Sequence, residues 1–127
     1  MKLDVKELIA KITNTLKGAT LSSSGLSAIS NRVSIQNGGQ VKLGKWRFVQ
    51  LNLKLLINLS ANNYWGVLQG FDTAVSDTVS LSAVIPAKNG GAISAYLTST
   101  GNLALATDNA TPSANDTVLI TGWYIAQ

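Results

Sequence analysis

Aromatic residues close to amide and carboxylate side chains are the part of this sequence with a recognisable binding chemistry. Flat aromatic rings pack against the C–H faces of sugar rings, while amide and carboxylate groups hydrogen-bond to sugar hydroxyl groups. Residues 62–72 concentrate both kinds of side chain next to expected loops. The residues that we predict to form a saccharide-binding platform are Asn62, Asn63, Tyr64, Trp65, Phe71 and Asp72.

The aromatic residues also have a purely structural interpretation. Trp and Tyr side chains are usually substantially buried in folded proteins. They could therefore close the ends of a β-sandwich or lie at a subunit interface instead of binding a ligand. The residues to which both interpretations apply are Trp46, Tyr64, Trp65, Tyr96, Trp123 and Tyr124.

Catalytic chemistry has few candidates in this chain. The sequence contains no Cys and no His, which excludes thiol and imidazole nucleophiles, Ser-His-Asp triads and ordinary zinc sites. Two of the loop carboxylates could hydrolyse a glycosidic bond or help to bind calcium, but no spacing supports either role. These carboxylates are Asp72, Asp77, Asp108 and Asp116. We therefore expect a protein that is not an enzyme and that has no metal or other cofactor.

The composition is that of a single domain with a neutral, hydrogen-bonding surface. A chain of 127 residues is large enough for one core. Charged residues make up 13% of it, about half of the usual share. The net charge is +4, but the basic residues form no cluster with interleaved aromatics, so we expect no nucleic-acid partner. No apolar run is long enough to span a bilayer, and we expect no membrane insertion.

Residues 46–60 predict a long β-strand with one buried face. Every second residue from Val49 to Leu59 is apolar, and the interleaved residues are mostly polar. This period of two is typical of a strand, because successive side chains point to opposite faces. A long one-sided strand needs a second apolar layer over it, which indicates a β-sandwich or barrel.

Shorter stretches of the same character precede and follow this strand. The ranges that we predict to be strands are 32–36, 41–43, 64–68, 78–85, 93–97, 103–105 and 118–126. Turn signals lie at Asn37-Gly38-Gly39, Asn89-Gly90-Gly91 and Thr100-Gly101-Asn102. The predicted fold class is all-β: residues 32–127 form an antiparallel β-sandwich or jelly-roll head domain.

The N-terminal residues predict a short amphipathic helix in front of the head domain. Apolar residues recur there at intervals of three and four, at Val5, Leu8, Ile9, Ile12 and Leu16. Such a short helix is marginal alone in water, so the apolar stripe needs the sheet domain or copies of itself as a partner. The stripe is wide enough for three helices. We predict residues 1–17 to be a helical stem suited to a trimeric coiled coil, and the small residues of 18–31 to be a linker.

Five pieces of sequence follow one another in a characteristic order. They are GGQVKLGKWRFVQLNLKLLI, NYWGVLQGF, TVSLSAVIPA, GAISAYLTSTGNLAL and DTVLITGWYIA, and together they span about residues 33–126. This order resembles the C-terminal head domains of bacteriophage tail-fibre and baseplate receptor-binding proteins. In one respect the chain departs from the family, because Leu68-Gln69 stands where a proline is usual.

The resemblance implies a host-attachment function. It implies a homotrimeric β-sandwich head, part of a phage virion and extracellular after host lysis, that recognises a saccharide of the bacterial surface. Other phage tail or baseplate proteins are the further partners that it implies. The alternative is a structural subunit of a virion or tail appendage that makes only protein–protein contacts.

Overall fold

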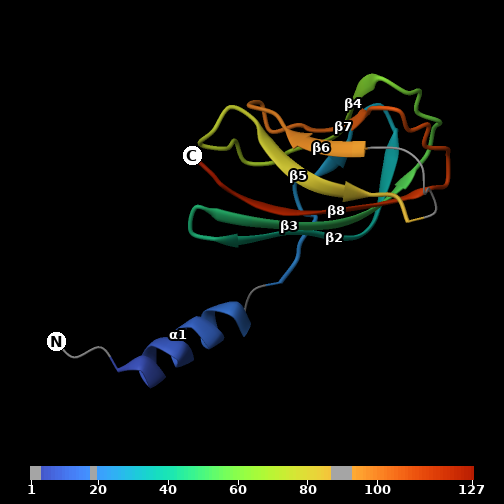
Figure 1. Ribbon diagram of the computed structural model, residues 1–127. Coiled ribbons are helices and arrows are strands. Elements are labelled where there is room, and N and C mark those ends of the chain that lie inside the picture. The colour runs from blue at the N-terminus through green and yellow to red at the C-terminus, as the bar shows by residue number, and fades with distance from the viewer. Residues whose placement is uncertain (1–3, 18–19, 87–92) are drawn as a thin grey trace.

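The backbone forms one helix and eight strands in the residues that the computed structural model describes. These residues are 4–17, 20–86 and 93–127, and within the helix the side chains of residues 12–17 are not described. The elements, shown in Figure 1, are α1 (Val5–Lys17), β1 (Ser27–Ala28), β2 (Val33–Leu43), β3 (Trp46–Leu55), β4 (Asn63–Gln69), β5 (Val79–Val84), β6 (Ile93–Leu97), β7 (Leu103–Thr107) and β8 (Thr117–Ile125).

The strands form two packed layers that share one strand. The eight strands are hydrogen-bonded in the order β1-β4-β7-β6-β5-β8-β3-β2, and every pair is antiparallel. The first half of β5 pairs with β6 and its second half pairs with β8, so β5 crosses from one layer to the other. A bridge between Ser22 and Gln40 brings the chain before β1 against β2, which nearly closes the sheet into a barrel. The prediction of an all-β antiparallel fold with a short N-terminal helix is confirmed.

The inward face of β3 lies at the centre of the core. Val49, Leu51, Leu53 and Leu55 are at most 2% exposed, as the alternation in the sequence predicts. The strand ends at Leu55 and is shorter than predicted. The neighbouring strands explain this end point. Strand β2 begins opposite Leu55, and β8 begins opposite Lys54. Residues 57–60 therefore have no strand partner.

The turn predicted at Asn37-Gly38-Gly39 is wrong. These residues lie inside β2, and the hairpin to β3 turns at residues 44–45 instead. Gly38 has a φ of 91° and follows a β-bulge between Ile35 and Asn37. A Cβ atom at Gly38 would collide with the carbonyl oxygen of Gln50 on β3. The two glycines therefore mark a bulge and a close approach of two backbones. Both features favour glycine for the same reason as a turn does, because glycine has no Cβ and can adopt a positive φ.

Other turn and linker predictions fall into three groups. The turn at Thr100-Gly101-Asn102 connects β6 to β7, as predicted. The predicted turn at Asn89-Gly90-Gly91 lies outside the described residues. Within the predicted linker, residues 20–31 are described, and part of this segment pairs with the sheet, where β1 lies against β4 and the Ile29 N–H donates to the carbonyl of Val67 at 2.9 Å.

Helix α1 begins with an Asp cap and leaves its apolar stripe exposed. The Asp4 carboxylate accepts a hydrogen bond from the Lys6 N–H at 2.9 Å, which is a typical N-cap contact. Val5, Leu8 and Ile9 are 65%, 42% and 57% exposed, and Figure 1 shows α1 lying clear of the strands. The side chains of the other predicted stripe residues, at positions 12 and 16, lie outside the described part. No helix within the described residues has the length and apolarity needed to cross a membrane.

The close approach at Gly38 predicts a large effect of a single methyl group. In Gly38→Ala the added Cβ meets backbone rather than a movable side chain, so we expect the free energy of unfolding to fall by about 2–4 kcal/mol. Gly44→Ala is the matched control, because Gly44 also has a positive φ, of 58°, but has open space around its Cβ position. We expect it to lose about 1 kcal/mol. Urea unfolding followed by Trp fluorescence measures both, and equal losses would contradict this explanation.

Candidate functional site

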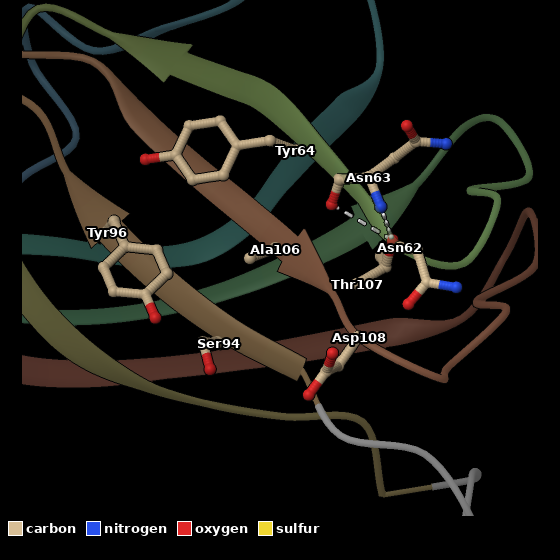
Figure 2. A pocket seen from close by; sticks show the side chains of 8 residues that line it. All are labelled: Asn62, Asn63, Tyr64, Ser94, Tyr96, Ala106, Thr107 and Asp108. Atoms are coloured by element: carbon tan, nitrogen blue, oxygen red, sulfur yellow. Dashed lines mark hydrogen bonds between the residues drawn. The ribbon is translucent and has the colours of Figure 1, made fainter.

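An open hollow lies on the outer face of the β4-β7-β6 layer. Its volume is about 620 Å³, and Figure 2 shows the side chains around it. The lining residues are Asn62, Asn63, Tyr64, Ser94, Tyr96, Ala106, Thr107 and Asp108. They come from the start of β4, from β6 and from the end of β7, so three separate stretches of the chain build the site.

The register of the three strands places two large rings around small side chains. One cross-strand row contains Tyr64, Ala106 and Ser94, and in the next row Ala104 lies beside Tyr96. Side chains in one such row share a face of the sheet. Ala106 on β7 therefore forms a low point between a tyrosine on β4 and a tyrosine on β6 and lines the hollow, whereas Ala104 is 1% exposed and does not line it.

The two tyrosine rings are stacked. The ring centroids of Tyr64 and Tyr96 are 6.0 Å apart, with an angle of 25° between the ring planes. A third ring inserted between them would need roughly twice the 3.5–4.0 Å contact distance of carbon atoms, so a ligand must pack alongside the pair. Burial raises the pKa of Tyr64 above its usual value, and the neighbouring Tyr96 raises it further. The phenol of Tyr64 is therefore neutral at pH 7 and can both donate and accept hydrogen bonds.

Thr107 anchors the polar end of the hollow. Its hydroxyl group is buried, donates to the carbonyl of Ser60 and accepts from the N–H of Asn63 at 3.2 Å. The N–H of Asn62 donates to the carbonyl of Asp108 at 2.8 Å. These contacts hold the start of β4 against the end of β7, while the side chains of Asn62 and Asp108 stay exposed at the rim. The only charged group among the described lining residues is the carboxylate of Asp108.

The structure brings three of the predicted site residues together. Asn62, Asn63 and Tyr64 all line the hollow. Trp65 does not, because the next residue along a strand points to the opposite face. Its indole packs against the core, under the guanidinium group of Arg32, which lies 5.3 Å from the ring centroid.

Phe71 and Asp72 lie beyond the opposite end of β4 from the hollow. Phe71 is 5% exposed and belongs to the core. The Asp72 carboxylate accepts a hydrogen bond from Arg47 Nε at 2.8 Å and forms an ion pair with Lys42 Nζ at 3.2 Å. The Arg47 hydrogen bond holds the pKa of Asp72 below its usual value, and Lys42 lowers it further. The Tyr124 hydroxyl donates to the Asp72 carbonyl at 2.9 Å, and burial raises the pKa of this phenol to about 12.

Sequence reasoning missed five of the eight residues that line the hollow. Ser94, Tyr96, Ala106, Thr107 and Asp108 complete it, and they are separated from Asn62 by 32 to 46 positions. The available signal was weak: Asp108 is a loop carboxylate and Tyr96 an aromatic in a short alternating strand. Nothing local indicates that β4 and β6 lie on either side of β7. In the part of the chain that the structure describes, no three His, Cys, Asp or Glu side chains are grouped to hold a metal ion.

Comparisons with known proteins identify no relative of this chain. No family model, curated protein sequence or solved structure matches the chain.

The ion pair at Asp72 predicts a pH-dependent stability. A carboxyl whose pKa is lowered in the folded state stabilises the protein above its unfolded-state pKa, and this contribution disappears as the pH falls through the folded-state value. At pH 7 we expect Asp72→Asn to lower the free energy of unfolding by about 1 kcal/mol. Below pH 4 we expect the difference from the wild type to shrink towards zero. Urea unfolding from pH 7 to pH 2.5 measures it, with the exposed Asp77→Asn as control, and a pH-independent difference would refute the assignment.

Proposed function

We propose that this chain is a non-enzymatic attachment module that binds a saccharide of the bacterial surface, as the receptor-binding head of a phage tail or baseplate. The observation that carries the proposal is the stacked tyrosine pair beside a rim of amide, hydroxyl and carboxylate groups (Figure 2). Aromatic faces and fixed polar groups together match the two sides of a sugar ring, one with C–H bonds and the other with hydroxyls.

The charge of the hollow supports a neutral ligand. Asp108 is the only charged group among its described lining residues, and a carboxylate repels uronic acids and phosphates by the ordinary like-charge effect. Hydroxyl groups of a neutral sugar can instead donate to this carboxylate and to the side-chain oxygens of Asn62 and Asn63. We propose neutral sugars as the preferred class.

The single carboxyl group of the hollow supports recognition rather than catalysis. A glycosidase uses two carboxyl groups on either side of the scissile bond, roughly 5–9.5 Å apart. The described lining residues include a single carboxyl, that of Asp108. An open site of this kind suits one or two sugar units at the end of a glycan, and several copies of the module raise the overall affinity through multivalency.

The exposed stripe on α1 supports a homotrimer. Val5, Leu8 and Ile9 are exposed within one chain, and a 13-residue helix gains most of its stability from packing. We propose α1 as the element that joins the copies, with other tail or baseplate proteins as further partners. The sequence resemblance to phage receptor-binding heads supports a place in the virion.

A second candidate function is a structural subunit of a phage appendage that contacts only proteins. The observation that favours it is the exposure of Trp46, Phe48 and Trp123 on the other layer of the sandwich, where they are 45%, 41% and 59% exposed. Exposed aromatic clusters are typical of protein interfaces. The two functions differ in one property, because a purely structural subunit has no saccharide-dependent adhesion.

Removal of the tyrosine rings tests the proposed function. We expect Tyr64→Ala and Tyr96→Ala each to weaken binding to host surface polysaccharide at least tenfold, since each removes half of the stacking surface. Tyr64→Phe keeps the ring and is expected to retain most of the affinity. Biolayer interferometry on immobilised polysaccharide measures the effect, with exposed Leu56→Thr as a control outside the hollow. Full binding by both alanine variants would place the ligand elsewhere, and no binding by the wild type would favour the structural subunit.

The carboxylate of Asp108 predicts a selectivity against anionic sugars. We expect Asp108→Asn to shift the ratio of anionic to neutral glycan binding roughly two- to fivefold towards the anionic member, the size of an exposed charge interaction. A glycan array with matched neutral and uronate-containing pairs measures this ratio. The shift is expected to shrink in 0.5 M salt, because salt screens exposed charges. An unchanged ratio would show that Asp108 does not face the ligand.

A further inference from the structure

An apolar patch covers one end of the outer face of the β2-β3-β8 layer. The register places Leu43, Trp46 and Ile125 in one cross-strand row. The next row contains Val41, Phe48 and Trp123. We call these six side chains the sheet patch.

The sheet patch has a sharp boundary and continues sideways. The following row consists of Gly39, Gln50 and Thr121, so the apolar surface stops after two rows. At the side of β8, the N–H of Val75 donates to the carbonyl of Ile125 at 2.9 Å, and the Val75 side chain is 63% exposed. An apolar hollow of about 410 Å³ lies between this segment and β8. The surface is therefore continuous over four neighbouring segments of the chain.

The exposed area is large for a lone chain. Fully buried aromatic side chains cover 150–250 Å² each, so three rings that are 45%, 41% and 59% exposed leave roughly 300 Å² in water. Trp46 and Trp123 also contact each other edge to face, with centroids 6.1 Å apart, and form a single ridge. The rings alone reach the size of the largest patch on a typical monomer, which indicates that another surface covers them.

Helix α1 carries an apolar surface of matching dimensions. Neighbouring strands lie about 4.8 Å apart, so the four segments of the patch extend roughly 15–20 Å, and its two rows are about 7 Å wide. A helix rises 1.5 Å per residue, so the predicted stripe from Val5 to Leu16 is roughly 16 Å long. A helix about 10 Å in diameter, laid across the strands, therefore covers both rows along its whole stripe.

We propose that the stripe of α1 in one copy packs on the sheet patch of a second copy. Within one chain the described stripe residues Val5, Leu8 and Ile9 are exposed, and α1 lies clear of the strands on the side of β2 and β3 (Figure 1). Each copy thus offers one helix and one patch, and such a head-to-tail contact can close into a ring of three. The proposal rests on association through α1 as proposed above, and it does not depend on saccharide binding.

Disulfide capture between two single-cysteine variants of different size, one of them extended by a tag, tests the contact directly. The natural chain contains no cysteine, so only the introduced cysteines can react. One chain carries Ile9→Cys and the other Phe48→Cys. Mixed and oxidised, they are expected to give a covalent heterodimer on a non-reducing gel. Val84→Cys replaces Phe48→Cys in the control, since Val84 is 50% exposed in the same layer but lies beyond the polar row. Equal capture by the control, or none with Phe48→Cys, would overturn the proposal. A single chain that carries both Ile9→Cys and Phe48→Cys would also overturn it if its disulfide formed only within that chain.

Light scattering separates this contact from a helix-only bundle. Phe48→Thr/Trp123→Thr changes only exposed side chains and is expected to weaken association at least tenfold, as is Leu8→Ser/Ile9→Ser. Val84→Thr is expected to have no effect, and circular dichroism checks that all variants fold. An oligomer that survives loss of the patch but not loss of the stripe would show that the helices bind one another, which refutes the contact and leaves the saccharide proposal intact. Binding of the dispersed patch variant to polysaccharide reports on the hollow separately.

Discussion

The burial of one face of β3 is the interaction on which the rest of the structure depends. Four of its side chains, from Val49 to Leu55, are almost completely excluded from water. Because β2 and β8 pair with β3 on its two sides, their registers follow from the same face. Strand β5 then carries the sheet from this layer to the opposite one. Every outward side chain in both layers takes its direction from this buried surface.

The two outer faces differ in the side chains that their outward rows carry. On the β4-β7-β6 layer, the small residues of β7 separate two tyrosines and leave a hollow with a polar rim. On the β2-β3-β8 layer, large apolar residues fill two complete rows. The first face suits a hydroxyl-rich ligand, and the second suits a protein surface. The attachment function that we propose would use both kinds of surface, one to bind a target and one to join an assembly.

The sequence predicted elements better than it predicted their partners. The alternation of 46–60 and the apolar stripe from Val5 to Leu16 are local patterns, and both led to the correct element type. The glycines at positions 38 and 39 misled the prediction, because a bulge in a strand and a turn between strands need the same conformational freedom. Asn62, Asn63 and Tyr64 were found because they are adjacent in the chain. Tyr96 and Asp108 were not, because the order of β4, β7 and β6 leaves no local signal.

The sequence by itself determined the all-β class, the amphipathic N-terminal helix and the inward face of the central strand. A repeating pattern of apolar residues indicates which side of a helix or strand must be buried. The neighbouring elements need not be known for that inference. Only the tertiary structure decided that Trp65 turns to the core while Tyr64 lines the hollow, and that Asp72 pairs with Arg47. Such choices depend on register between strands that are far apart in the chain, which global packing selects and local pattern does not.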